Sequence, residues 1–162
     1  MEYKQFFLSE LEREMPNTRK LLALVPEEQA DWKPHAKSYS LEALASHLVQ
    51  LTGFAVTMAK DETYDFSNWK NISLKTNAEL LAEFDRQLEQ TKAAIEALDE
   101  TDFQKTWSMS AGETVIATFP KWDALQNIYL HHFIHHRAQL GVYLRLLNIP
   151  LPGMYGPSAD EQ

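Results

Sequence analysis

The 162-residue chain contains no cysteine. Disulfide bonds, thiolate metal ligands and cysteine nucleophiles are therefore excluded, and any metal site must use nitrogen and oxygen ligands. Long apolar runs are also missing, because charged or polar residues interrupt every apolar stretch well before the roughly 20 residues that a membrane-spanning helix needs. The N-terminal segment MEYKQFFLSELEREM is acidic where a signal peptide has a basic start and an apolar centre. We therefore expect a cytoplasmic protein that is not a membrane protein.

Clusters of positive charge are absent as well. The chain has 15 Lys and Arg against 23 Asp and Glu, a formal net charge of -8, and its basic residues are scattered singly among acids. A phosphate-binding surface needs clustered Lys and Arg, so a nucleic-acid partner is excluded and an anionic membrane surface is disfavoured. The motifs GxGxxG, Walker A and GxSxG do not occur, which leaves nucleotide-binding and serine-hydrolase functions without support.

Apolar residues recur at helical spacing in four segments, 3–25, 41–60, 77–98 and 122–147. Pro16 falls inside the first segment and should kink or divide it. Residues 100–120 alternate on either side of Ala111-Gly112, a pattern consistent with a short hairpin. The chain has the length of one domain and no linker that divides it. We therefore predict an all-α fold, a four-helix bundle over residues 1–162 with long connections and a possible short hairpin before the last helix.

Four of the six histidines lie in the last predicted helix, in the run HHFIHHRAQL. Two pairs have the i, i+4 spacing that places side chains on one helix face: His131 with His135, and His132 with His136. At about 100° per residue, His132 and His136 lie near the centre of the apolar arc, and the other pair lies on its shoulder. Each unmade hydrogen bond of a buried imidazole costs on the order of 1–3 kcal/mol. A shared metal ion would satisfy both rings, and so would hydrogen bonds to neighbouring groups.

A third ligand would have to come from another helix. His47, in the run LASHLVQL, lies among apolar residues at the edge of the second helix's apolar arc, so periodicity permits an inward direction without requiring it. His35 lies in a proline-flanked loop, where solvent exposure is the expectation. No Glu-x-x-His motif occurs on any predicted helix, which disfavours a di-iron bundle.

Three segments, DWKPHAKSYSLEALASHLVQL, HHFIHHRAQL and VYLRLLNIPLPGMYGPSADE, resemble the DinB-like (YfiT-like) superfamily of metal-binding four-helix bundle proteins. The resemblance implies that His47, His132 and His136 together bind one divalent ion, commonly nickel or zinc. It departs at Ala138, where the family often has glycine. It also implies a homodimer and, in some members, thiol S-transferase activity with small thiols; other members resemble metal-dependent hydrolases or isomerases.

Three neutral imidazoles would leave an ion with its full charge and at least one open position. We therefore expect a metal-dependent enzyme that acts on a small molecule by thiol transfer or by hydrolysis. In the case of thiol transfer, one substrate would be a small thiol. A non-catalytic metal-binding or stress-response protein and a helical interaction module with metal-free histidines remain as alternatives.

No general base or other catalytic residue is apparent in the sequence. Tyr129 and Tyr143 share the apolar arc with the histidines, and Gln139 lies near its edge. These three residues are therefore candidates to hydrogen-bond or contact the histidine ligands without binding the ion themselves. Packing is the simpler role for the two tyrosines. Arg137 is placed opposite the apolar arc, and we expect it to pair with an acid of an adjacent helix.

Overall fold

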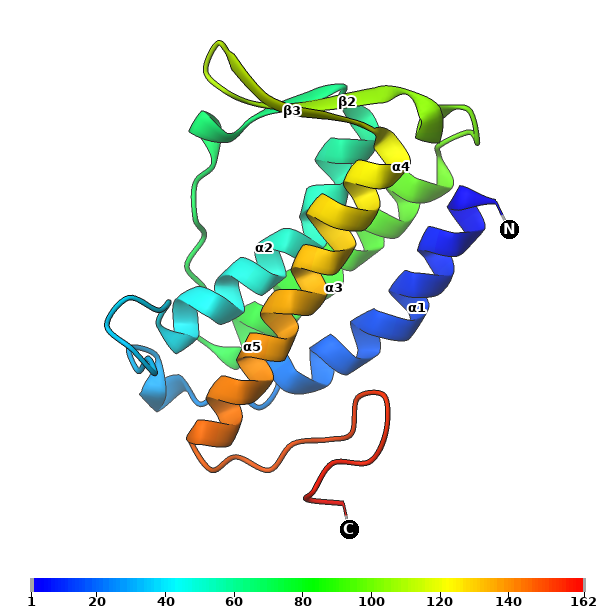
Figure 1. Cartoon of the computed structure of the whole chain (residues 1–162). Helices are drawn as coiled ribbons and strands as arrows, with labels where there is room; N and C mark the ends of the chain where they lie inside the picture. Colours follow the sequence, from blue (N-terminus) through cyan, green and yellow to red (C-terminus); the bar gives the residue numbers. More distant parts are fainter. Residues whose placement is uncertain (1, 162) are drawn as a thin grey trace.

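The computed structural model describes residues 2–161, which form a bundle of four long helical segments (Figure 1). These segments are α1 (Tyr3–Leu22), α2 (Leu41–Lys60), α3 (Asn77–Glu96) and a last helix that runs through α4 (Lys121–Ala124), η4 (Leu125–His131) and α5 (His132–Leu146). Their positions match the four predicted segments to within about three residues at each end, the usual uncertainty of helix boundaries. None of the helices within residues 2–161 is long and apolar enough to cross a membrane.

Local hydrogen bonds explain where the second and third helices begin. The hydroxyl of Ser40 accepts a hydrogen bond from the backbone N–H of Ala43 at 3.2 Å, so it caps the first turn of α2. Thr76 and Glu79 form a reciprocal capping box at the start of α3. Pro16 does not divide α1, which is one continuous helix that changes direction along its length (Figure 1). Of the two predicted effects of this proline, division is excluded.

The last helix departs from a regular α-helix just before the histidines. Residues Leu125–His131 form a π-helix, whose hydrogen bonds span five residues and widen the turns. A constant step of 100° per residue therefore does not hold across this segment. Arg137, predicted on the side opposite the core, is in fact buried with 2% of its surface exposed. The helix lies between α1 and α2, so more than one face of it is covered.

A small sheet covers one end of the bundle (Figure 1). The predicted hairpin is present as β2 (Thr106–Ala111) and antiparallel β3 (Thr114–Pro120), and Gly112 at its tip has a φ of 59°. A third strand, β1 (Thr63–Asp65), pairs parallel with β2 and was not predicted. The all-α prediction is therefore correct only in part, since the bundle also carries a three-stranded sheet.

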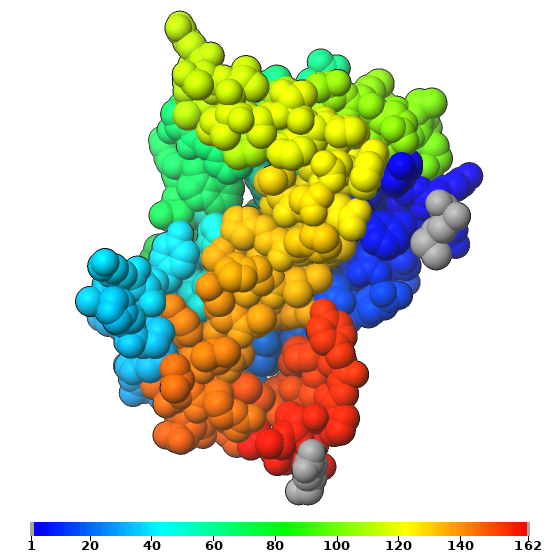
Figure 2. All heavy atoms as spheres, in the orientation of Figure 1, coloured from blue at the N-terminus to red at the C-terminus, as the bar shows by residue number. Residues whose placement is uncertain are grey.

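A buried ion pair joins the last helix to α1. The carboxylate of Glu14 lies 2.5 Å from Nη2 of Arg137, and each side chain is only 3% exposed. Arg137 also donates to the backbone carbonyl of Glu14 at 3.0 Å, and Tyr155 Oη donates to the Glu14 carboxylate at 2.8 Å. The predicted pairing of Arg137 with an acid on a neighbouring helix is confirmed. Tyr155 thus brings the C-terminal tail to this ion pair, and Figure 2 shows the tail, in red, lying against α1 and α5.

Candidate metal centre

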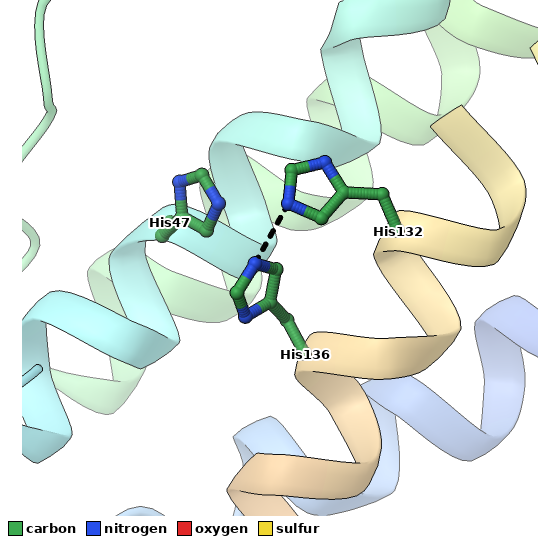
Figure 3. A group of neighbouring side chains, drawn as sticks. All are labelled: His47, His132 and His136. Carbon is green, nitrogen blue, oxygen red and sulfur yellow. Dashed lines mark hydrogen bonds between the residues drawn. The ribbon is translucent and has the colours of Figure 1, made fainter. Parts of the chain in front are cut away.

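Three partly buried imidazoles from two helices meet between α2 and α5. His47 comes from α2, while His132 and His136 come from successive turns of α5, and Figure 3 shows their rings around one point. Each ring offers one nitrogen to a common point, and these three nitrogens all lie within 4.8 Å of one another. Nε2 of His132 and Nε2 of His136 are 2.8 Å apart. The predicted convergence of these three side chains is therefore observed.

Hydrogen bonds behind the rings determine which nitrogen carries the proton. Nδ1 of His136 lies 2.8 Å from Oε1 of Gln139, and because an amide oxygen only accepts, Nδ1 is the protonated nitrogen. The backbone carbonyl of Ile128, one turn before His132, raises the pKa of the His132 ring, although burial lowers it by more. In neutral rings that carry their proton on Nδ1, both Nε2 atoms would present lone pairs to each other across 2.8 Å. That contact is repulsive unless a proton or a metal cation lies between them.

All three rings are biased toward their neutral form. Burial, followed by the charges of His136 and His132, lowers the pKa of His47 from 6.5 to about 4. Burial is also the largest cause that lowers the pKa of His132 and of His136. Neutral imidazole is the form that binds a metal ion, so at pH 7 these ligands need not lose a proton first.

The donor set is compatible with a divalent metal ion. Imidazole nitrogen suits several such metals, and zinc, for example, binds it at about 2.0–2.1 Å, which places two such ligands about 3.3 Å apart in a tetrahedral site. The observed 2.8 Å between the two Nε2 atoms and the upper limit of 4.8 Å for the group bracket that separation. No carboxylate belongs to this cluster, which consists of histidines alone.

The other histidines stay outside the cluster. His131 and His135 are exposed, and His131 Nδ1 is bonded at 3.0 Å to the side chain of Asn127. His35 is exposed, as expected, and its Nδ1 accepts a hydrogen bond from the backbone of Lys37 at 3.1 Å. Of the two i, i+4 pairs, only His132 and His136 face His47.

The sequence pattern of the DinB superfamily matches residues 10–140, a stretch that includes α2, α3 and all three clustered histidines. The chain belongs to the DinB superfamily. It is 26% identical over 155 residues to the uncharacterized protein YrdA of Bacillus subtilis strain 168, a match that covers 96% of this chain and 89% of YrdA.

Two solved structures share the DinB-superfamily fold. A DinB-like protein of Bacillus subtilis, YjoA, superposes with a TM-score of 0.69 at 20% identity, over 95% of this chain and 96% of that one. A DinB-like protein of Bacillus cereus ATCC 10987 superposes with a TM-score of 0.74 at 17% identity, over 92% and 95% of the two chains. At this level of identity the likeness shows the fold alone.

The three candidates for supporting residues have different surroundings in this DinB-superfamily chain. Gln139 bonds His136, as described above. Tyr143 does not touch the histidine rings but contacts Tyr39: its hydroxyl donates to the Tyr39 carbonyl at 3.3 Å, and the Tyr39 ring lies 5.7 Å from that of His47. Tyr129 is buried, its hydroxyl has no hydrogen-bond partner, and burial raises its pKa. Its one aromatic neighbour among residues 2–161 is Phe133, so it packs in the core.

A cavity of about 360 Å³ lies directly beside His47 and His132. Its remaining walls come from α2, the connection after β1, strand β2 and the π-helical segment: Leu51, Phe54, Phe66, Trp69, Met109, Asn127 and Ile128. Sequence reasoning missed Phe66 and Trp69, because the irregular connection that carries them has no periodicity. Its aromatic content, in the run YDFSNW, was the one available signal.

Proposed function

We propose that this protein is a metal-dependent enzyme that acts on a small molecule, with His47, His132 and His136 holding one divalent ion, nickel or zinc. Thiol S-transfer or hydrolysis is the reaction class. The proposal is carried by one observation, the convergence of three imidazole nitrogens at the edge of a cavity. Such an ion supplies a Lewis acid with an open position, which acidifies a bound water or thiol.

The chain's own residues hold and orient the ligands. Gln139 bonds the ring of His136, which orients that ring toward His47. Hydrogen bonds of this kind also raise the basicity of a histidine ligand. Tyr39 packs beside the rings of His47 and His136, with centroids 5.7 and 6.4 Å away, and Tyr143 holds its backbone. The site is therefore supported from both helices.

The adjoining cavity favours an enzyme over a protein that only stores or senses metal. A closed structural site surrounds its ion with protein ligands, whereas a catalytic site keeps a position for substrate. Here two of the three ligands, His47 and His132, line a cavity of about 360 Å³. That volume lies in the usual range for small-molecule sites.

Metal analysis of the untagged protein tests the ligand set. The chelated protein is reloaded with Ni²⁺ or Zn²⁺ and its content is measured by mass spectrometry of the elements, for the wild type and for His132→Ala. We expect one ion per wild-type chain and a large loss in the variant. His131→Ala is the matched control, since its ring lies one residue away on the exposed face. Equal metal content in His132→Ala and the wild type would remove the proposed ligand.

Turnover is tested separately, with small thiols paired with uncharged electrophiles and with activated esters. We expect activity that disappears on chelation and returns when the metal is restored. Rates that chelation leaves unchanged would exclude the proposed chemistry. A protein that binds one ion through these histidines and turns over none of these compounds would be reassigned to metal binding without catalysis.

A further inference from the structure

The cavity beside the histidines has a composition that points to a class of substrate. We propose that it binds an uncharged aryl group of one or two rings, or a branched alkyl group of similar size. We further propose that Trp69 determines how large a group is accepted. This inference rests on the proposed function for the reacting end of the substrate, which would lie at His47 and His132. The binding of the apolar group can be measured without any metal.

The first support is the chemistry of the walls. Six of the nine lining residues are apolar or aromatic, and the exceptions are the two histidine ligands and Asn127. No charged side chain lines the cavity. Burial of a charged group without a partner is costly, so a charged ligand portion is disfavoured inside it. A cationic portion would in addition be repelled by a divalent ion at the histidines.

The second support is that the aromatic wall is built and held in place. The ring of Trp69 packs edge-on against those of His47 and Phe54, with centroids 5.9 and 5.7 Å apart, and stacks on Phe66 at 6.3 Å. Its indole N–H donates to Asn71 at 2.8 Å. Edge-to-face contacts of this kind fix ring orientations, so the wall presents a defined surface to a planar ligand.

The backbone that carries this wall is tied to α2 on either side of Asn71. The side chain of Gln50 donates to the carbonyl of Lys70 at 2.7 Å and accepts from the N–H of Ile72 at 3.4 Å. Gln50 lies one turn of helix after His47, so the same helix positions the metal ligand and the wall. A preformed cavity loses less conformational freedom when a ligand enters.

The third support is a second cavity behind Trp69. This space, of about 310 Å³, has a mixed lining: three glutamines of α2 and α3, Gln50, Gln87 and Gln90, and apolar or aromatic residues that include Val56 and Tyr64. Trp69 and Phe54 line both cavities and therefore lie between them. Phe54 belongs to α2, whereas Trp69 lies on the irregular connection, so removal of the indole should enlarge the cavity toward the second space and Trp69 limits ligand size.

Two fluorescent probes that differ by one charge test the proposal on metal-free protein. N-phenyl-1-naphthylamine is uncharged, and 1-anilinonaphthalene-8-sulfonate is the same scaffold with a sulfonate. We expect saturable binding of the uncharged probe at one site per chain and at least tenfold weaker binding of the sulfonate. Met109→Trp, which fills the cavity from β2, should weaken the uncharged probe at least tenfold. Ile116→Trp, on the exposed face of β3, is the matched control and should leave binding unchanged.

Trp69→Ala and Trp69→Phe test the size limit. The alanine variant should bind a longer uncharged probe, diphenylhexatriene, at least tenfold more tightly than the wild type does, and the phenylalanine variant should stay close to the wild type. Far-UV circular dichroism and thermal melts confirm that each variant is folded. Leu51→Phe fills the same cavity from α2 if Met109→Trp does not fold.

Several results would overturn the inference. Equal affinity for the two naphthalene probes would contradict the exclusion of charged groups from the cavity. Equal binding by Met109→Trp and Ile116→Trp would place the probe elsewhere. Probe binding that falls in parallel with self-association would assign the cavity to a second copy of the chain. Metal binding without probe binding would refute this inference alone, and probe binding without metal binding would refute the proposed function alone.

Discussion

Replacement of Glu14 by alanine should be among the most damaging single changes in the bundle. The substitution leaves the guanidinium of Arg137 without its carboxylate, in a position where both side chains are only 3% exposed. Removal of one partner of a buried ion pair costs about 3–5 kcal/mol, because the other charge stays buried and unpaired. Arg137 keeps its bond to the backbone carbonyl of residue 14, so we expect a value near the lower limit, about 3 kcal/mol. Domains of this kind are stable by only about 5–15 kcal/mol.

Urea unfolding followed by circular dichroism measures this loss, provided that the denaturant dependence of the variant matches that of the wild type. Asp85→Ala is the matched control, since its ion pair with Arg19 also joins two helices but is 48% exposed on each side. Exposed pairs contribute about 0–1 kcal/mol. A loss below about 1 kcal/mol for Glu14→Ala, or one equal to that of Asp85→Ala, would refute the reasoning.

The double variant Glu14→Met with Arg137→Met sharpens the test. Replacement of both charges by apolar side chains leaves no unpaired group, so the double variant should be more stable than Glu14→Ala. Arg137 directly follows His136 on α5, so a shift of this helix would also move a proposed metal ligand. Glu14→Ala should therefore bind metal more weakly than Asp85→Ala does. If the double variant were the less stable of the two, burial of an unpaired charge would not be the source of the effect.

Three further predictions concern the site and the helix that carries His47. Gln139→Leu should lower metal affinity about 10–100-fold in calorimetric titrations, while Gln139→Glu, which still accepts from His136, should not; equal affinities would remove the supporting role. Metal-free protein should lose stability as the pH falls from 6.5 toward 4, because the unfolded His47 ring binds a proton in this range and the folded ring, with a pKa of about 4, does not. The loss should be about 1–2 kcal/mol for a half-buried ring and smaller in His47→Gln; a pH profile that this substitution leaves unchanged would contradict the assignment. Ser40→Ala should cost about 1 kcal/mol in thermal or urea unfolding, since it removes the cap of α2, and an unchanged midpoint would show that the cap is unimportant.

Local sequence was sufficient to locate the four long helices. Apolar spacing and start signals such as Ser40 act over a few residues, so they can be interpreted without knowledge of the fold. The same holds for the pair His132 and His136, whose i, i+4 spacing places both rings on one helix face whatever surrounds them. The hairpin at Ala111-Gly112 was also visible, because alternation and a turn residue lie next to each other in the chain.

Other features depend on partners far along the chain. Strand β1 has three residues, too few for a pattern, and exists because β2 pairs with it from more than 40 residues away. Arg137 is buried although the helix wheel places it opposite the apolar arc, because α1 and α2 cover this helix on two sides. The π-helical turns before His132 shift the wheel itself.

The sequence by itself determined that three imidazoles were available and that two of them share a helix face. Only the tertiary structure decided that His47 meets them. Periodicity left the direction of the His47 side chain open, and the packing of α2 against α5 directs it toward His132 and His136. The packing of the connection against α2 likewise placed Trp69 over His47 and created the cavity. Spacing acts along one helix, whereas a site between helices depends on how their faces pack together.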